Sequence, residues 1–310
     1  MPNPALAVSD HFRLMYASSV TMVAQQTRNA LEGAVTPISA TGEAQSVTDL
    51  MAPLEYQYGE DRSRRNPENL VTGTRRWVTR PPVIESGQYI DKEDKFATAT
   101  DPTSNFVTVH TRAVLRGKQD RILGIRKNPD GTFSVADGGI FGYSTEGKRG
   151  TTQTALPASQ YVPVGTTGLT LDKLRLAKLA LQKADFGIED DDQLYGLISP
   201  TQGDNLLSIA AQAMNNVVGF NIEQLRSGKP TPLMGINWIM TNRLPVDAAA
   251  SRLCPIFSKK NIIAGIWQDV KGDAWNDSHA KNLPYVYVSA YIDCVRVQDK
   301  GVIVIECKES

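Results

Sequence analysis

One segment of this chain comes close to a motif that binds phosphate. Gly142, Gly147 and Lys148 have the spacing of a phosphate-binding loop, in which backbone amides and the lysine hold the phosphate groups. The motif then requires a Ser or Thr hydroxyl for Mg²⁺, and Arg149 stands in that place. Residues 150–157 are rich in Thr and end in proline, so no helix N-terminus is predicted there to hold phosphate. A phosphate-binding enzyme therefore remains only as an alternative.

The other residue types that commonly carry chemistry are scattered along the chain. His11, His110 and His279 lie far apart, and none has a second ligand at the spacing of a metal site. The acidic run 189–192 lacks the alternating spacing and central glycine of a calcium loop, so it predicts a solvated turn. The sequence also contains no Gly-x-Ser-x-Gly nucleophile motif. We therefore predict no catalytic residue, no cofactor and no metal, and a protein that is not an enzyme.

Arginines gather in residues 55–80, with carboxylates between them. The candidate site residues are Arg62, Arg64, Arg65, Arg75 and Arg76. Because a guanidinium fork binds carboxylates as readily as phosphates, two interpretations are open, namely ion pairs between subunits and contact with DNA. The interleaved acidic side chains, with Pro81 and Pro82 after the cluster, favour the first interpretation. We predict these arginines as contacts between subunits.

Composition sets the broad class of the protein. The 310 residues are 41% hydrophobic, and 33 basic side chains balance 33 acidic ones, which does not indicate a dedicated nucleic-acid binder. No run approaches the ~20 apolar residues of a membrane span, so no membrane partner is expected. The three cysteines are too few, and odd in number, for a secreted disulfide framework. Together these features predict a soluble globular chain that is made and used in a cytoplasm.

Several segments carry signals for local structure. Residues 103–125 follow a helix entry and have apolar side chains at helical spacing. Residues 169–185 predict a second helix that Thr170 caps, with Leu171 on its apolar face and Lys173 on its solvent face. Residues 194–198 form a short apolar strand. These elements alternate without an internal repeat.

The segments that follow predict a capped helix and a final hairpin. Ser199 can accept a hydrogen bond from the amide of Gln202 while the Gln202 side chain reaches back, which is a capping box. Residues 285–297 and 302–307 predict two paired strands around a turn at 299–301. In that register Cys294 and Cys307 are diagonal neighbours at roughly 7–8 Å. A disulfide needs a closer approach, so we expect free thiols.

The first 54 residues differ from the rest. Residues 9–32 have an interrupted apolar stripe, and residues 33–54 are Thr-, Ser-, Ala- and Gly-rich with few charges. We predict an arm that buries little surface in its own chain and becomes ordered on neighbouring subunits; a frayed terminus is the alternative.

In kind and order, these segments resemble the major capsid proteins of tailed bacteriophages, which have the Hong Kong phage 97-type fold. Encapsulins and the herpesvirus capsid floor share that fold. The resemblance implies an α+β chain with an N-terminal arm, an extended β loop, a peripheral domain with a long spine helix, and an axial domain. The expected boundaries are 1–54 for the arm, 55–100 for the loop, 101–190 for the peripheral domain, 191–267 for the axial domain, and 268–310 for the return strands of the peripheral domain.

The resemblance also implies a function. Copies of the chain would form pentamers and hexamers of an icosahedral shell, in a virion assembled in the host cytoplasm, around double-stranded DNA held without sequence specificity. The residues before the arginine-rich segment are too few for a built-in scaffold, so a separate scaffolding protein and a portal are expected partners, with decoration proteins as a further option. An encapsulin-like shell that encloses cargo enzymes is the alternative.

Overall fold

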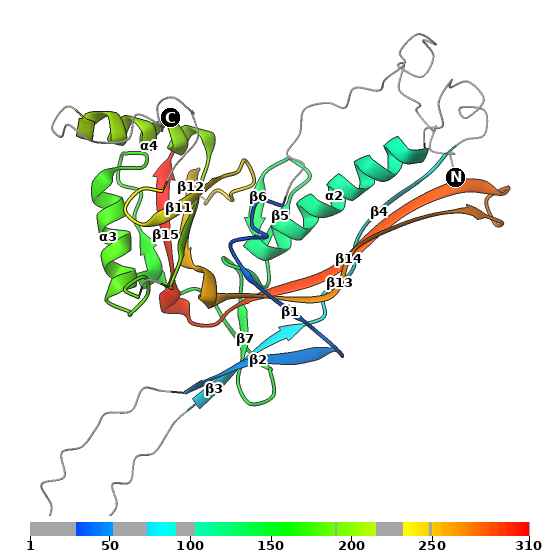
Figure 1. The fold of residues 1–310 in the computed structure, drawn as a ribbon, viewed down its shortest axis with the longest axis horizontal. Helices are drawn as coiled ribbons and strands as arrows, with labels where there is room; N and C mark the ends of the chain where they lie inside the picture. The colour runs from blue at the N-terminus through cyan, green and yellow to red at the C-terminus, as the bar shows by residue number, and fades with distance from the viewer. Residues whose placement is uncertain are drawn as a thin grey trace, which may run out of the picture.

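The computed structural model describes residues 29–51, 73–90, 103–189, 191–214, 232–247 and 250–309. Within them the chain has few helices and many strands, which form mixed sheets, so the α+β prediction is confirmed (Figure 1). We name three parts below: the compact half, the hairpin half and the lower lobe. The predicted segments at 1–28 and 52–72, together with residues 91–102, lie outside the described residues.

The compact half is a five-stranded sheet with two helices beside it. The strand order is β11 (Ile236–Met240), β10 (Leu194–Ile198), β12 (Ser251–Ser258), β15 (Val302–Lys308) and β9 (Tyr161–Val162). The helices are α3 (Leu171–Gln182) and α4 (Pro200–Met214). Leu174, Leu197 and Phe257 are fully buried between these layers. Burial of each such side chain stabilises the fold by about 1.5–3 kcal/mol.

The hairpin half is built on two long strands that extend away from the compact half (Figure 1). Its sheet has the order β1 (Thr36–Ser39), β13 (Ile262–Asp277), β14 (Leu283–Arg296) and β4 (Ile84–Tyr89). Helix α2 (Thr103–Leu123) covers one face, where Val114 packs with Val288 and Ala290 of β14. The helix predicted at 103–125 is thus present. It ends before Gly124, whose φ of 72° is a conformation that glycine adopts without strain.

The lower lobe lies on the other side of the hairpin half. It is a four-stranded sheet of β2 (Ala44–Met51), β3 (Gly73–Thr79), β7 (Ser144–Glu146) and β8 (Thr152–Thr154). Val78 and Ala40 pack there against Val295 of β14. A separate two-stranded sheet pairs β5 (Ile125–Lys127) with β6 (Phe133–Val135). Short 3-10 turns occupy Ala158–Gln160, Lys259–Asn261 and Asp299–Gly301.

The predicted helix caps are present, with one difference. Thr170 accepts from the amide of Lys173, and Ser199 Oγ accepts from the amide of Gln202, each at 3.4 Å. Gln202 does not reach back, because its Oε1 accepts from the amide of Leu169 at 2.8 Å. Its Nε2 donates to the Lys308 carbonyl at 3.3 Å. A buried amide takes whichever partners surround it, and here those come from two other segments.

The predicted terminal hairpin is wrong. Strand β14 pairs with β13 and β4, whereas β15 pairs with β12 and β9 in the other sheet. The turn at Asp299–Gly301 therefore carries the chain from the hairpin half to the compact half. Cys294 lies opposite Ala264, and Cys307 lies opposite Arg252. All three cysteines are free and buried, so the absence of a Cys294–Cys307 bridge is confirmed, for a different reason from the one given by the hairpin register.

Two expectations from the sequence can be compared with the structure. Helix α3 lies beside the sheet that contains β15 and β9, and the end of α2 shares one core with them, so the predicted domain boundaries stay a prediction. The N-terminal arm was expected to bury little surface in its own chain, yet Leu31, Ala34 and Val35 are at most 3% exposed in the main core. Strand β1 adds to this by pairing in parallel with β13. Residues 29–51 are therefore part of the subunit's own fold.

Candidate inter-subunit site

Arg75 is the predicted contact residue that the structure leaves at the surface. It lies on β3, where its Nη2 donates to Asp49 Oδ2 of the neighbouring strand at 2.9 Å. Its guanidinium also stands over the Trp77 ring, 5.7 Å from the ring centre. The hydrogen bonds from Arg75 lower the pKa of the Asp49 carboxyl. Of the other predicted contacts, Arg62, Arg64 and Arg65 lie outside the described residues.

Arg76 corrects the expectation of a surface contact, because it is only 5% exposed. Its Nε donates to the Val297 carbonyl at 2.8 Å, and Nη1 pairs with Glu146 at 2.7 Å. Nη2 pairs with Asp299 at 3.4 Å. Neighbouring strand residues point to opposite faces of a sheet, so Arg75 faces solvent while Arg76 faces inward. Arg76 is thus bonded within its own subunit.

Arg296 completes a buried charged network that sequence reasoning missed. The residue is 0% exposed, and its Nη1 donates to the carbonyls of Ile140, at 2.9 Å, and Gly142. Its Nε pairs with Asp299 at 3.1 Å, so Asp299 lies between Arg296 and Arg76. Burial lowers the pKa of Arg296 and the Asp299 carboxylate opposes that effect. A signal was present in the sequence, since Arg296 stands between Val295 and Val297 in an apolar strand.

The segment that resembles a phosphate loop is a β-hairpin. Strands β7 and β8 are joined by a tight turn at residues 147–150, and Gly147 and Gly150 adopt φ of 96° and 67°. The Trp77 ring donates from Nε1 to the Gly147 carbonyl at 2.7 Å, which fixes the turn on the lower lobe. No helix follows Lys148, as the sequence predicted, whereas a phosphate-binding loop must lead into a helix. Lys148 and Arg149 are exposed at the tip.

We predict that the purified protein does not bind ATP, because an open hairpin turn offers no helix N-terminus for the phosphates. The measurement is isothermal titration calorimetry with Mg²⁺ and ATP, on the natural chain and on Lys148→Ala. Both titrations should show only the heat of dilution. Saturable binding that disappears in the variant would contradict the prediction.

Of the remaining candidates for chemistry, His110 and two carboxylates of the acidic run have structural partners. His110 is 9% exposed and its Nδ1 lies 2.8 Å from Ser86 Oγ, while burial lowers its pKa. His279 is exposed, and His11 lies outside the described residues. In the acidic run, Asp192 Oδ2 accepts from the Gly187 amide at 2.6 Å, and Asp191 pairs with Lys260. Among the described residues, no three His, Cys, Asp or Glu side chains are grouped to hold a metal ion.

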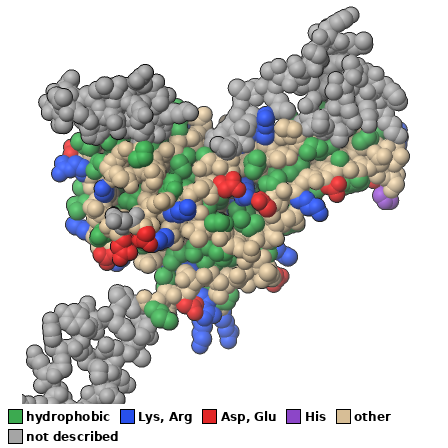
Figure 2. Space-filling model, in the orientation of Figure 1, with side chains coloured by type: hydrophobic (Ala, Val, Ile, Leu, Met, Phe, Trp, Pro, Cys, Tyr) green, Lys and Arg blue, Asp and Glu red, His purple; other side chains and the backbone are tan. Residues whose placement is uncertain are grey.

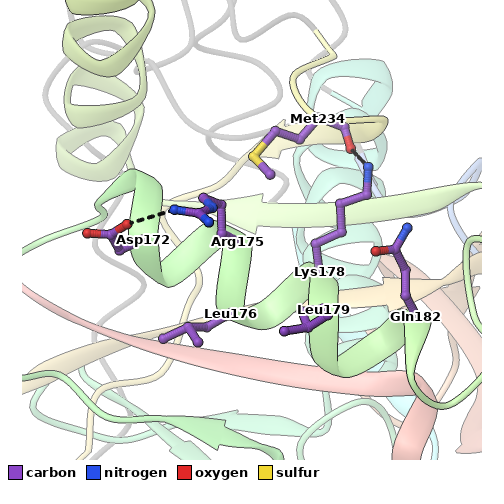
Figure 3. A pocket seen from close by; sticks show the side chains of 7 residues that line it. All are labelled: Asp172, Arg175, Leu176, Lys178, Leu179, Gln182 and Met234. Atoms are coloured by element: carbon purple, nitrogen blue, oxygen red, sulfur yellow. Dashed lines mark hydrogen bonds and ion pairs between the residues drawn. The ribbon is translucent and has the colours of Figure 1, made fainter.

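The outer face of α3 carries a hollow of about 600 Å³ (Figure 3). Its lining is Asp172, Arg175, Leu176, Lys178, Leu179, Gln182 and Met234. Leu176 and Leu179 are 57% and 48% exposed, and the Lys178 ammonium donates to the Met234 carbonyl at 2.7 Å. The lining lacks a histidine and has one carboxylate, which already pairs with Arg175. Exposed leucines with a charged rim suit contact with another protein surface.

Two residues of α3 also differ from the predicted amphipathic pattern. Leu171 was placed on the apolar face but is 45% exposed. Lys173 was placed in solvent but is only 8% exposed. Its ammonium donates to the carbonyls of Val164, Thr167, Gly168 and Glu306 at 2.7–3.0 Å. This cage of backbone oxygens compensates for the burial of the charge.

Comparisons with known proteins give a consistent picture. The capsid of cyanophage P-SCSP1u is 14% identical, with a TM-score of 0.66 over 97% of this chain and 94% of that one. The capsid of Ralstonia phage GP4 is also 14% identical, with a TM-score of 0.64 over 99% and 98% of the two chains. The cyanophage Pam1 capsid chain is 12% identical, with a TM-score of 0.62 over 99% of both chains. Likeness at this identity shows the fold.

Sequence comparison identifies the family. No curated protein sequence matches the chain. Within the described residues, no helix is long and apolar enough to cross a membrane. The family model described as "Phage capsid protein" matches residues 8–309, which is nearly the whole length. The chain therefore belongs to the phage capsid protein family.

Proposed function

We propose that copies of this major capsid protein assemble into pentamers and hexamers of an icosahedral shell that encloses double-stranded phage DNA. The observation that carries the proposal is the family match over residues 8–309. It favours a phage shell over an encapsulin-like compartment and over a phosphate-binding enzyme. The extended hairpin half and the exposed leucines of α3 support it, because the chain's own fold leaves these surfaces uncovered and available to other copies.

The charge balance is compatible with a DNA container. A strongly basic lining would hold the phosphates through counterion release and would oppose DNA movement. With 33 basic and 33 acidic residues, this chain need not do so. We further propose a separate scaffolding protein, a portal and decoration proteins as partners, assembly in the host cytoplasm, and a place in the virion.

Electron microscopy of the purified full-length chain, alone and after co-expression with the phage genes that flank its own, tests the proposal. Closed particles with local five-fold and six-fold symmetry are the expected result. The claim that the shell encloses DNA is tested on particles from infected cells, which should contain nuclease-resistant double-stranded DNA. A chain that stays monomeric under all these conditions would contradict the proposal.

Replacement of Arg62, Arg64 and Arg65 together by alanine is expected to leave the subunit folded but to prevent shell closure. Each exposed ion pair contributes only ~0–1 kcal/mol, yet a shell repeats every contact at each equivalent interface, so small losses accumulate. The measurement is circular dichroism melting beside particle counts by electron microscopy. The matched control is Arg126→Ala with Lys127→Ala, two exposed cations on another sheet. Normal shells from the triple variant would place the subunit contacts elsewhere.

A further inference from the structure

We propose that the Lys148–Arg149 turn of one copy docks on an aromatic, acidic face of the β13–β14–β4 sheet of the next copy. The inference rests on the proposed function, since it names a surface that would join copies in the shell. Both surfaces consist of described residues, and neither belongs to the arginine segment at 62–65. The contact is heterologous, meaning that two different patches of the chain meet.

The receiving surface is a cluster of rings, which we call the aromatic face. Trp275 lies 5.2 Å from Tyr285 and 6.1 Å from Tyr287, measured between ring centres, and Tyr89 lies 4.5 Å from Tyr285. Trp275 is 44% exposed, although large aromatic side chains are usually covered. Exposed, pre-packed Trp and Tyr side chains are the residue types that dominate binding energy at protein interfaces.

Carboxylates border these rings. The Tyr287 hydroxyl donates to Glu85 at 2.6 Å, and the Tyr89 hydroxyl donates to Asp277 at 2.7 Å. Asp273 lies opposite Tyr287 in the β13–β14 register, so its side chain is on the same face. Among the paired residues of these three strands that the structure describes, one cation, Lys271, shares this face, opposite Ser289. The local balance is therefore acidic, which suits a cationic partner that can also stack on a ring.

The aromatic face and the lower lobe lie on the same side of the sheet. Along β14, the even-numbered Val288 and Ala290 face α2. The odd-numbered residues face the other way: Val295 packs against Val78 of the lobe, and the Asp293 carboxylate accepts from the Thr79 amide. Because strand side chains alternate, Tyr285 and Tyr287 share that direction. In Figure 1 the lobe lies below the root of the hairpin, while the hairpin tip extends away from it.

The docking element is the turn at the end of this lobe. Lys148 and Arg149 are exposed there, and among the described residues no carboxylate forms an ion pair with either. Figure 2 shows Lys and Arg side chains that project from the bottom of the lobe. Trp77 holds the turn through its bond to the Gly147 carbonyl, so the two charges are carried by a fixed element. A fixed cationic tip loses little entropy when it docks.

Within one chain, the Lys148–Arg149 turn and the aromatic face lie at different ends of the same side of the sheet. The two surfaces therefore meet between copies of the chain. A heterologous contact of this kind generates closed rings when the rotation between copies closes. A pair of cations is a small site for a DNA backbone, whereas Glu85, Asp273 and Trp275 offer both carboxylates and a ring. We therefore assign the tip to a second copy of the chain and not to nucleic acid.

A charge-swap experiment tests the contact. Lys148→Glu with Arg149→Glu is expected to lower the yield of closed shells by about tenfold or more, because like charges then face each other. Glu85→Arg with Asp273→Arg should do the same. The chain that carries all four changes should recover most of the yield, since the attraction is restored with opposite sign. Circular dichroism melting must show all variants folded, and Arg126→Glu with Lys127→Glu is the matched control.

The outcomes separate this inference from the proposed function. Normal shells from both charge-reversed variants, or no recovery of shell yield in the variant with all four changes, would overturn the contact while leaving the capsid function in place. Normal shells that lose DNA when Lys148 and Arg149 are reversed would assign the tip to DNA and overturn it as well.

A second measurement does not depend on shell closure. Lys148→Cys and Asp273→Cys are made in separate full-length chains, whose natural cysteines are all buried. Under mild oxidation, a disulfide-linked dimer is expected in the mixture, well above the level in either chain alone. Equal dimer in all three samples, or dimer in none, would overturn the proposal.

Discussion

Arg296→Met is expected to destabilise the folded subunit by about 3–5 kcal/mol, the usual cost of removing one partner of a buried ion pair. The natural side chain is 0% exposed and donates to the Ile140 and Gly142 carbonyls while pairing with Asp299. Methionine fills similar space but leaves the carbonyls without a donor and the carboxylate without that cation. The net stability of a folded protein is about 5–15 kcal/mol, so the loss is a large fraction of it.

Urea unfolding followed by circular dichroism measures this effect. Arg175→Met on the exposed face of α3 is the matched control and should change stability by less than about 0.5 kcal/mol. Arg296→Lys should fall between the two, because a lysine keeps the charge but lacks the planar fork that reaches several acceptors at once. A midpoint for Arg296→Met equal to that of the natural chain would mean that the network contributes nothing to the fold.

Leu31→Ala is expected to cost about 2–5 kcal/mol, the usual range for a leucine removed from a packed core. Leu31 is 0% exposed and belongs to the main core, together with Ala34 and Val35. The expected result follows from the corrected position of the N-terminal region. If residues 29–51 were an arm ordered only by neighbouring subunits, the substitution would not change the free energy of unfolding of the free subunit.

The comparison uses the same unfolding assay with Leu176→Ala, which removes an equal volume from a side chain that is 57% exposed. That variant should keep nearly the natural unfolding midpoint. If Leu31→Ala left the free subunit unchanged but reduced shell yield, the arm interpretation would be restored and the burial of Leu31 would have to arise between subunits.

Local structure was predictable because its signals are local. Thr170 caps α3 through the amide of a residue three positions on, and Ser199 does the same for α4. Gly124 ends α2 because it takes a positive φ without strain. The strand Leu194–Ile198 was predicted with its observed bounds, since an apolar run between turn signals forms a buried strand. The order of these elements was sufficient to indicate the capsid fold.

The candidate site was predicted less completely. Arg75 and Arg76 are adjacent in the sequence, so composition alone grouped them, and only the pleat of β3 separates a surface side chain from a buried one. Lys173 reads as a solvent-facing lysine on α3 until the carbonyls of the 164–168 loop surround it. The aromatic face was equally hidden, because Trp275 and Tyr285 are brought together by cross-strand pairing.

The sequence by itself determined the approximate bounds of α2, α3 and β10 and the start of α4, and the order of these elements indicated the family of the fold. Only the tertiary structure decided which strands pair. Residues 302–305 of β15 are at most 2% exposed, so both faces of this strand are covered. Its edges pair with β12 and β9, while β14 lies in the other sheet. The sequence of a strand that is apolar on both faces does not indicate which strand it pairs with. The choice is made by packing between segments far apart in the chain, which local propensity does not encode.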